Sequence, residues 1–161
     1  RNNFISLMPT NLYGPNDNFD LKSSHVLPAL LRKFHEASKN KLETVEVWGT
    51  GKPQREFLHV DDLADACLFV FEKINAKELY ENLKLSHLNV GTGVDISINE
   101  LATMISKLVG FKGIVKYNDS FPDGTPRKLL DVSAINELGW ESSISLNDGI
   151  ESTYNWFLKN K

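Results

Sequence analysis

Cysteine is nearly absent from this sequence of 161 residues, and several other features are missing with it. Cys67 is the only cysteine, so no disulfide can form within the chain. The four histidines are scattered and lack the ligand spacing of a structural zinc site. No apolar run reaches the ~18 residues of a membrane span, and the start, Arg1 to Asn3, does not read as a signal peptide. These absences favour a soluble cytoplasmic protein with no metal and no membrane contact.

An excess of positive charge is also missing. Lysine and arginine total 18 against 21 aspartate and glutamate, giving a net charge of −3 and a pI near 5.8. A general nucleic-acid binder needs a basic surface, so that class is disfavoured. The hydrophobic content of 41% and the length predict one globular domain with a real core.

Strand-like and helix-like segments alternate along the chain, which predicts an α/β fold with a parallel or mixed sheet covered by helices. Ser97 and Glu100 form a capping box, Gly110 ends that helix, and Ser23 or Ser24 caps an earlier one. Strands are predicted at 3–8, 44–49, 55–60, 87–91 and 113–117, an extended stretch at 128–131, and helices at 24–37, 61–74, 98–109, 133–138 and after Ser145.

The helix at 61–74 has the clearest apolar periodicity, and its opening aspartates suit the positive end of a helix. Its predicted buried face consists of Leu63, Ala66, Cys67, Val70, Phe71 and Ile74. Cys67 is therefore expected to be a buried, unreactive hydrophobe rather than a nucleophile.

Two motifs suggest cofactor chemistry but lack its context. Gly91-Thr92-Gly93 follows a strand, yet Ile96 stands where a dinucleotide fingerprint has its third glycine, so a tight turn is the better interpretation. Tyr80 and Lys84 match the Tyr-x-x-x-Lys pair of short-chain dehydrogenases. They lie in a charged connector without an apolar stripe, which favours coincidence.

The chain opens directly on an apolar, β-prone segment that Pro9 ends, whereas native termini are usually polar. This predicts a piece of a longer protein. Six motifs then carry a specific resemblance: PTNLYGP at 9–15, SHVLPALLRKFHEA at 24–37, VWGTG at 47–51, REFLHVDD at 55–62, NVGTG at 89–93 and PDGTPRKLLD at 122–131. Together they resemble the GDP-L-fucose synthases, within the extended short-chain dehydrogenase/reductase family, over nearly the whole chain.

The resemblance implies the C-terminal, substrate-binding part of an extended short-chain dehydrogenase, whose Rossmann-like N-terminal core is missing here. Residues 1–161 would form a single substrate-binding domain, with 1–12 and parts of the middle strands completing the cofactor-domain sheet. The glycine-rich loop and the Ser and Tyr-x-x-x-Lys reduction machinery of the family lie upstream of this segment. The fragment alone is therefore expected to be inactive, and the full-length protein to be a homodimer.

The family reaction converts GDP-4-keto-6-deoxymannose to GDP-L-fucose by epimerisation at C3 and C5 and reduction by NADPH. The C4 ketone acidifies the neighbouring protons, so epimerisation needs acid/base groups with a pKa near the working pH. His25 matches the catalytic histidine of the family, and histidine, with an ordinary pKa of ~6.5, suits this work. A histidine that only hydrogen-bonds the preceding loop is the alternative.

Further roles follow only from the resemblance. The cofactor NADP would contact Pro9, Thr10, Asn11, Leu12 and His25, but the absent half would supply most of its binding site. The substrate would contact Asn11, Lys33, Trp48, Arg55, Asp123, Arg127 and Lys128. Lys33 stands where the family prefers arginine, so the diphosphate contact falls to Lys33 or to Arg32.

Several of these residues also have a purely structural interpretation. Trp48 could pack in the core, and Arg127 and Lys128 could lie on a solvated turn. For the whole chain, the alternatives are a related nucleotide-sugar epimerase or dehydratase, acting on a UDP-sugar or on GDP-mannose, and a non-catalytic nucleotide-sugar-binding module.

Overall fold

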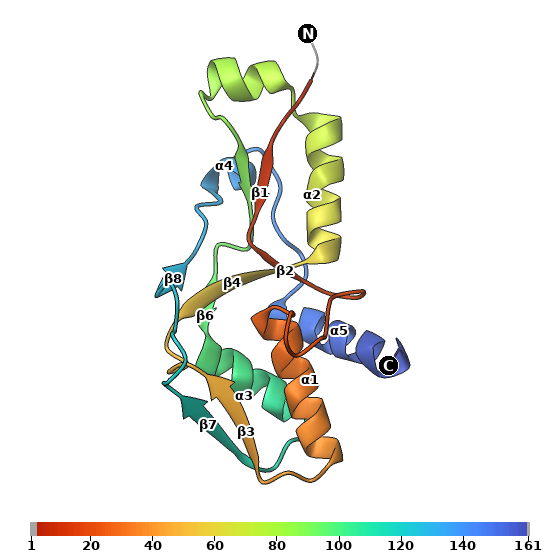
Figure 1. Cartoon of the computed structure of the whole chain (residues 1–161). Coiled ribbons are helices and arrows are strands. Elements are labelled where there is room, and N and C mark those ends of the chain that lie inside the picture. Colours follow the sequence, from red (N-terminus) through yellow and green to blue (C-terminus); the bar gives the residue numbers. More distant parts are fainter. Residues whose placement is uncertain (1–2, 161) are drawn as a thin grey trace.

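The computed structural model describes residues 3–160 (Figure 1). Residues 1, 2 and 161, which the predicted domain boundaries include, lie outside the described residues. The elements are β1 (Leu7–Pro9), β2 (Asn11–Tyr13), α1 (Val26–Lys39), β3 (Thr44–Trp48), β4 (Gln54–His59), α2 (Val60–Lys73), a π-helical turn η1 (Glu78–Asn82), β5 (Leu88–Val90), β6 (Asp95–Ser97), α3 (Ile98–Val109), β7 (Ile114–Asn118), β8 (Arg127–Lys128), α4 (Ser133–Glu137) and α5 (Leu146–Asn160).

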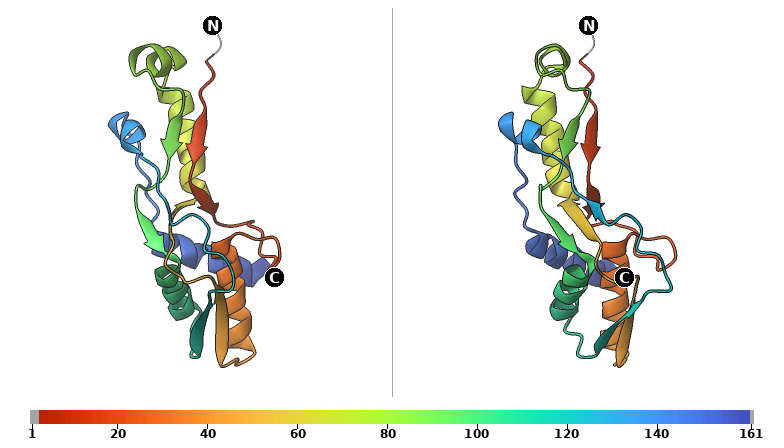
Figure 2. Two further views of the ribbon diagram at one scale, coloured as in Figure 1. Left: turned by 60° about the vertical axis from the view of Figure 1, so that its left-hand side comes forward. Right: turned by 90° about the vertical axis from the view of Figure 1, so that its left-hand side faces the viewer.

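The described chain is elongated, with two lobes that meet at β4 (Figures 1 and 2). The upper lobe holds β1, β5, α2, η1 and α4, and the lower lobe holds α1, α3, α5, β3 and β7. Between them β4 pairs in parallel with β2 and β8 and antiparallel with β6. Its neighbouring residues Phe57 and Leu58 point to opposite faces, so Phe57 packs in the lower core and Leu58 in the upper one.

The mixture of parallel and antiparallel strand pairs agrees with the predicted α/β class. The prediction of a single sheet was wrong. The described strands form three small sheets: β1 with β5, β3 with β7, and the group around β4. Strands of two to six residues leave little length for continuous pairing across both lobes. Residues 3–8 contain only the start of β1, and β2 and β6 were not anticipated.

The sequence signals for helix ends predicted the structure better than the strand patterns did. The Ser97 hydroxyl accepts the backbone N–H of Glu100, and the Glu100 carboxylate accepts the N–H of Ser97, so the capping box is confirmed. Gly110 ends α3 in the left-handed conformation, as predicted. Helix α1 starts later than expected: its N-cap is His25, which makes no side-chain capping bond, rather than Ser23 or Ser24.

The burial of Cys67 was predicted wrongly. Ala66 and Val70 on α2 and its C-cap Ile74 are buried in the upper core, whereas Cys67 is exposed and Phe71 is 83% exposed. The helix has a second apolar face, because Leu68 lies beside Cys67 and Phe71 at helical spacing and is 61% exposed. Periodicity reveals apolar faces but not which of them the rest of the chain covers.

The exposed thiol gives a simple test of this correction. Cys67 in the native chain is expected to react with a maleimide under non-denaturing conditions, because no core packing shields it. Mass spectrometry of the intact chain would show one adduct, and Cys67→Ser would show none. If Cys67 reacted only in urea, its side chain would be buried as the sequence predicted.

Candidate functional site

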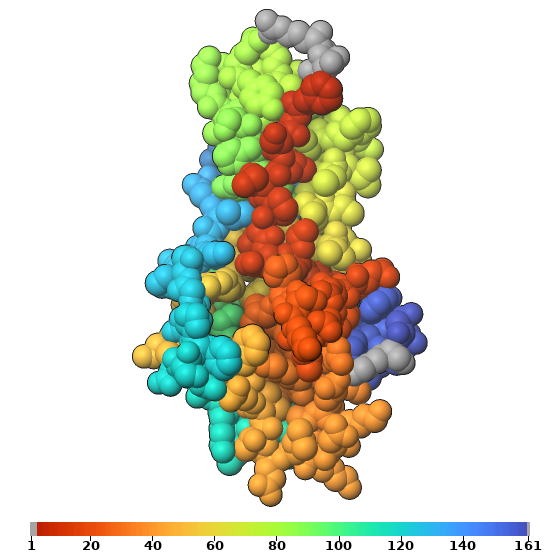
Figure 3. Space-filling model, in the orientation of Figure 1, coloured from red at the N-terminus to blue at the C-terminus, as the bar shows by residue number. Residues whose placement is uncertain are grey.

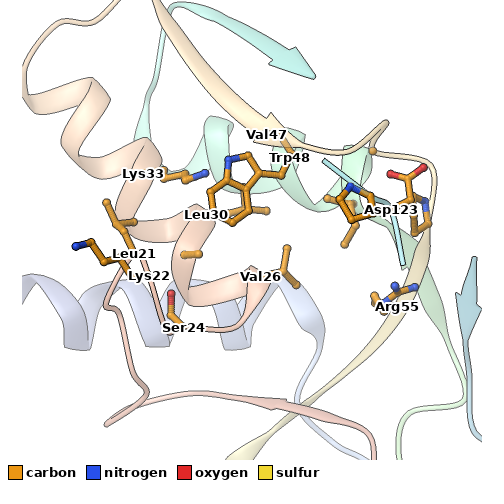
Figure 4. A pocket seen from close by; sticks show the side chains of 15 residues that line it. Leu21, Lys22, Ser24, Val26, Leu30, Lys33, Val47, Trp48, Arg55 and Asp123 are labelled. Carbon is orange, nitrogen blue, oxygen red and sulfur yellow. The ribbon is translucent and has the colours of Figure 1, made fainter. Parts of the chain in front are cut away.

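A pocket of about 270 Å³ lies between α1, the segment before it, the β3–β4 turn and the loop after β7 (Figure 4). In Figure 3 the orange segment at α1 and the cyan loop lie on the same face of the molecule. The pocket floor is apolar and its rim carries charge. The floor comprises Val26, Ala29, Leu30, Val47, Pro53 and Ile98, and the rim includes Lys22, Lys33, Arg55 and Asp123.

Of the two basic residues at 32 and 33, Lys33 faces the pocket. Its ammonium lies 4.6 Å from the centre of the Trp48 ring and donates to the Glu46 carbonyl at 3.3 Å. Burial lowers the pKa of Lys33, and the nearby Glu46 charge opposes that shift. Arg32 instead pairs with Glu36 at 2.7 Å and donates to the Phe19 carbonyl. The geometry therefore assigns the pocket cation at this helix position to Lys33.

The turn after β3 shapes one wall of the pocket. Asp123 accepts the backbone N–H of Thr50 at 2.7 Å and its hydroxyl at 2.6 Å, and these hydrogen bonds are the main cause of the lowered pKa of Asp123. Gly49 and Gly51 have positive φ, and a side chain at either would collide with Asp123 or with the Tyr117 ring. Both glycines of the motif are thus required by close approach.

Arg55 brings a second cation to the same pocket from β4 (Figure 4). One guanidinium nitrogen donates to the Gln54 carbonyl at 2.7 Å, which anchors the half-buried side chain. Proteins commonly use guanidinium and ammonium groups to bind a phosphate or diphosphate. Lys33 and Arg55 therefore bring two positive charges to the lining of one pocket in a chain that is acidic overall.

Glu56, the next residue, was missed by the sequence reasoning. Its side chain is fully buried and accepts backbone N–H groups of Thr92, Gly93 and Leu130 at 2.7, 2.8 and 2.9 Å. Its own carbonyl accepts the side chain of Asn11 at 2.7 Å. The signal that could have found it is an acidic residue inside a strand, directly before the apolar pair Phe57 and Leu58. Glu56 ties together segments that are distant in the sequence.

The same hydrogen bonds explain the motif at 91–93. The N–H groups of Thr92 and Gly93 already bind Glu56, so they are not presented to a phosphate. A side chain at Gly91 would collide with the Glu56 carboxyl group. The tight-turn interpretation is thus favoured. Tyr80 lies in the short turn η1, where its hydroxyl donates to the Phe4 carbonyl.

His25 lies at the edge of the pocket rather than in its lining. The imidazole is exposed, and its neighbours Ser24 and Val26 both line the pocket. Burial raises the pKa of Asp17, while the N–H of Asn18 and the nearby His25 oppose that rise. A buried oxygen of Asp17 and the hydroxyl of Ser24 have no hydrogen-bond partner in the described chain.

The remaining predicted site residues lie elsewhere. Pro9, Thr10 and Asn11 line a second, shallower hollow of about 410 Å³ together with Lys128. Leu12 is partly buried against the upper core. Arg127 lines neither hollow, because its guanidinium forms a bidentate pair with Asp95 at 2.6 and 3.1 Å and lowers the pKa of that carboxylate.

The described residues offer no cluster of three or more histidine, cysteine, aspartate or glutamate side chains suited to a metal ion. Within the same residues, none of the helices combines the length and apolar character needed to cross a membrane.

Comparison with known proteins gives a consistent result. The family model described as the NAD dependent epimerase/dehydratase family matches residues 1–91. GDP-L-fucose synthase of Escherichia coli strain K12 is 58% identical over 160 residues, covering 98% of this chain and 50% of that protein. GDP-L-fucose synthase 1 of Arabidopsis thaliana is 54% identical over 156 residues, covering 97% and 46%. The chain thus spans about half the length of these relatives.

Solved structures agree with the sequence matches. A GDP-6-OMe-4-keto-L-xylo-heptose reductase from Campylobacter jejuni superposes with a TM-score of 0.91 at 42% identity, covering 99% of this chain and 55% of that one. A GDP-L-fucose synthetase from Naegleria fowleri bound to NADP gives a TM-score of 0.84 at 29% identity, covering 98% and 47%. The architecture of this chain is therefore that of about half of such a protein.

Proposed function

This chain belongs to the NAD-dependent epimerase/dehydratase family, and we propose that it is the GDP-sugar-binding part of a GDP-L-fucose synthase. The full-length enzyme would convert GDP-4-keto-6-deoxymannose to GDP-L-fucose with NADPH. This chain alone would not catalyse that reaction. The observation that carries the proposal is the pocket in which Lys33, Trp48, Arg55 and Asp123 meet. We also propose a cytoplasmic location, because a chain with one cysteine needs no oxidising compartment.

The chemistry of the pocket suits a nucleoside diphosphate. Its volume of about 270 Å³ lies at the small end of ligand pockets, which suits the nucleoside end of the substrate rather than all of it. The apolar floor takes the flat base and ribose, and Lys33 with Arg55 neutralises the diphosphate. Each Asp123 oxygen that binds Thr50 has a second lone pair. Asp123 can therefore still accept the N–H groups that guanine presents.

His25 would act on the hexose. The sugar follows the diphosphate, so it extends beyond the nucleoside pocket, and His25 stands exposed at that pocket's edge. There it would carry protons to and from C3 or C5, next to the C4 ketone, with its partner group in the other half of the protein. Asn11 would contact the hexose through the atoms that Glu56 does not engage.

Of the five residues predicted for NADP, the four from Pro9 to Leu12 would meet one end of that cofactor, whereas His25 lies at the edge of the other pocket. Pro9, Thr10 and Asn11 form an open hollow together with Lys128, which suits a flat polar ring better than a whole dinucleotide. Leu12 would support this loop from the upper core. When bound, NADPH supplies the hydride that reduces C4. The rest of its site would belong to the half of the family fold that this chain does not contain.

A chimera tests the proposal directly. This chain would replace the matching half of the Escherichia coli relative, with which it shares 58% identity. Formation of GDP-fucose from GDP-4-keto-6-deoxymannose and NADPH, followed by chromatography, is the expected result. A chimera that folds and binds NADP but releases only a differently epimerised or unreduced sugar would favour a related epimerase or dehydratase. A folded chimera that binds GDP without turnover would favour a binding module.

Arg55 is expected to dominate diphosphate binding. Arg55→Ala removes a charge-assisted contact worth about 1.5–3 kcal/mol, so the affinity of the chain for GDP should fall by about 10- to 100-fold. Isothermal titration calorimetry measures the effect. Arg127→Ala is the matched control, because Arg127 pairs with Asp95 outside the pocket. Equal losses in the two variants would mean that net charge, rather than the pocket, governs binding.

A further inference from the structure

One wall of the pocket carries two stacked aromatic rings, of which only one has a proposed role. The rings of Trp48 and Phe121 lie 4.6 Å apart with an angle of 12° between their planes. Trp48 is 53% exposed and Phe121 is 38% exposed, so neither belongs to a core. The alternative that Trp48 packs in the interior is therefore wrong. Two large exposed aromatic side chains held face to face need another explanation.

The loop that carries Phe121 is fastened at both ends. Before it, Asn118 pairs with Trp48 in the β3–β7 ladder and accepts the backbone N–H of Phe121 at 3.3 Å. After it, Asp123 holds both the backbone and the hydroxyl of Thr50. The stack is therefore built into the loop geometry.

The two rings have different relations to the pocket. Trp48 lines it, and so does Lys33, whose ammonium lies over the indole. Phe121 contacts Trp48 but is not among the residues that line the pocket. Trp48 therefore stands between the pocket and Phe121 (Figure 4 shows the pocket side). The contact of Phe121 that leads to the pocket is therefore its stack on the indole.

We infer that Phe121 is a positioning residue for nucleoside recognition, which acts by holding the Trp48 indole as a flat wall of the pocket. The inference rests on the proposed function and deepens it. An exposed tryptophan can rotate about two side-chain bonds, and a ligand that packs against the indole must stop that rotation. Phe121 stops it in advance, so the wall is preformed before the base arrives. Its effect concerns the base and not the diphosphate.

The test compares three ligands on the same chain: GDP, UDP and inorganic pyrophosphate. Phe121→Ala should weaken GDP binding by about five- to tenfold, the effect of ordering one side chain on binding. Its preference for GDP over UDP should shrink, and pyrophosphate affinity should stay within about twofold. Phe121→Tyr should restore GDP affinity because it keeps the stacked ring. Phe71→Ala is the control, because Phe71 is an exposed phenylalanine on α2 (83% exposed, against 38% for Phe121) that does not contact Trp48.

A spectroscopic readout separates positioning from folding. In a background with Trp140→Phe and Trp156→Phe, the fluorescence anisotropy of Trp48 should fall in Phe121→Ala while the far-UV circular dichroism stays unchanged. Unchanged GDP affinity and anisotropy in Phe121→Ala would overturn the inference and leave the proposed function standing. Equal losses for GDP and pyrophosphate would also overturn it. A starting chain that binds pyrophosphate but not GDP would overturn the proposed function itself.

Discussion

Replacing Glu56 by alanine is expected to lower the free energy of unfolding by about 4 kcal/mol or more, the largest stability effect that the structure indicates. The side chain is fully buried and accepts the N–H groups of Thr92, Gly93 and Leu130. Each buried N–H left without a partner costs about 1–3 kcal/mol, and the cavity adds to that cost. Urea denaturation followed by circular dichroism measures the change.

A second variant makes this prediction sharper. Glu56→Gln keeps the volume, but its amide NH₂ must face at least one of the three N–H donors, so a loss of about 2 kcal/mol is expected. Glu72→Gln, at an exposed position on α2, should change stability by less than about 0.5 kcal/mol. A Glu56→Gln variant as stable as the original chain would show that these hydrogen bonds do not hold the three segments together.

Replacing His25 by alanine is expected to remove proton exchange at the sugar carbons. In the chimera with the Escherichia coli relative, His25→Ala should slow solvent-deuterium incorporation at C3 or C5 by about 10²- to 10⁴-fold, the usual contribution of a general acid or base. GDP affinity should change by less than about twofold, because the imidazole lies outside the lining of the nucleoside pocket. Mass spectrometry of the recovered sugar and calorimetry of GDP binding give the two values.

The control for His25 is another exposed histidine. His87, beside Ser86 in the upper lobe, lines neither hollow, so His87→Ala should leave deuterium incorporation unchanged. Unaltered exchange in His25→Ala would refute its acid/base role and favour the alternative, in which His25 only supports the loop before α1. If His25→Ala lost both GDP affinity and deuterium exchange, the variant would instead have a collapsed pocket.

The motifs of the chain named residues that line two separate hollows, but they did not show how those residues divide between them. Lys33, Trp48, Arg55 and Asp123 are up to 90 residues apart and still line one pocket, with His25 at its edge. Pro9, Thr10, Asn11 and Lys128 lie at a separate hollow. Arg127 was grouped with the pocket because it adjoins the motif at 122–126, yet Asp95 draws its side chain away. Proximity in a motif does not specify where a long side chain finds its partner.

The sequence alone determined the features that depend on a few neighbouring residues: the capping box of Ser97 and Glu100, the left-handed Gly110, and the motifs that reveal the family. These signals act over one or two turns of backbone, so they need no knowledge of the rest of the chain. Only the tertiary structure decided that Cys67 and Phe71 lie outside, that Glu56 joins three segments, and that Phe121 stacks on Trp48. Each of these depends on which distant segment packs against a given face, and such packing is a property of the assembled fold rather than of local sequence.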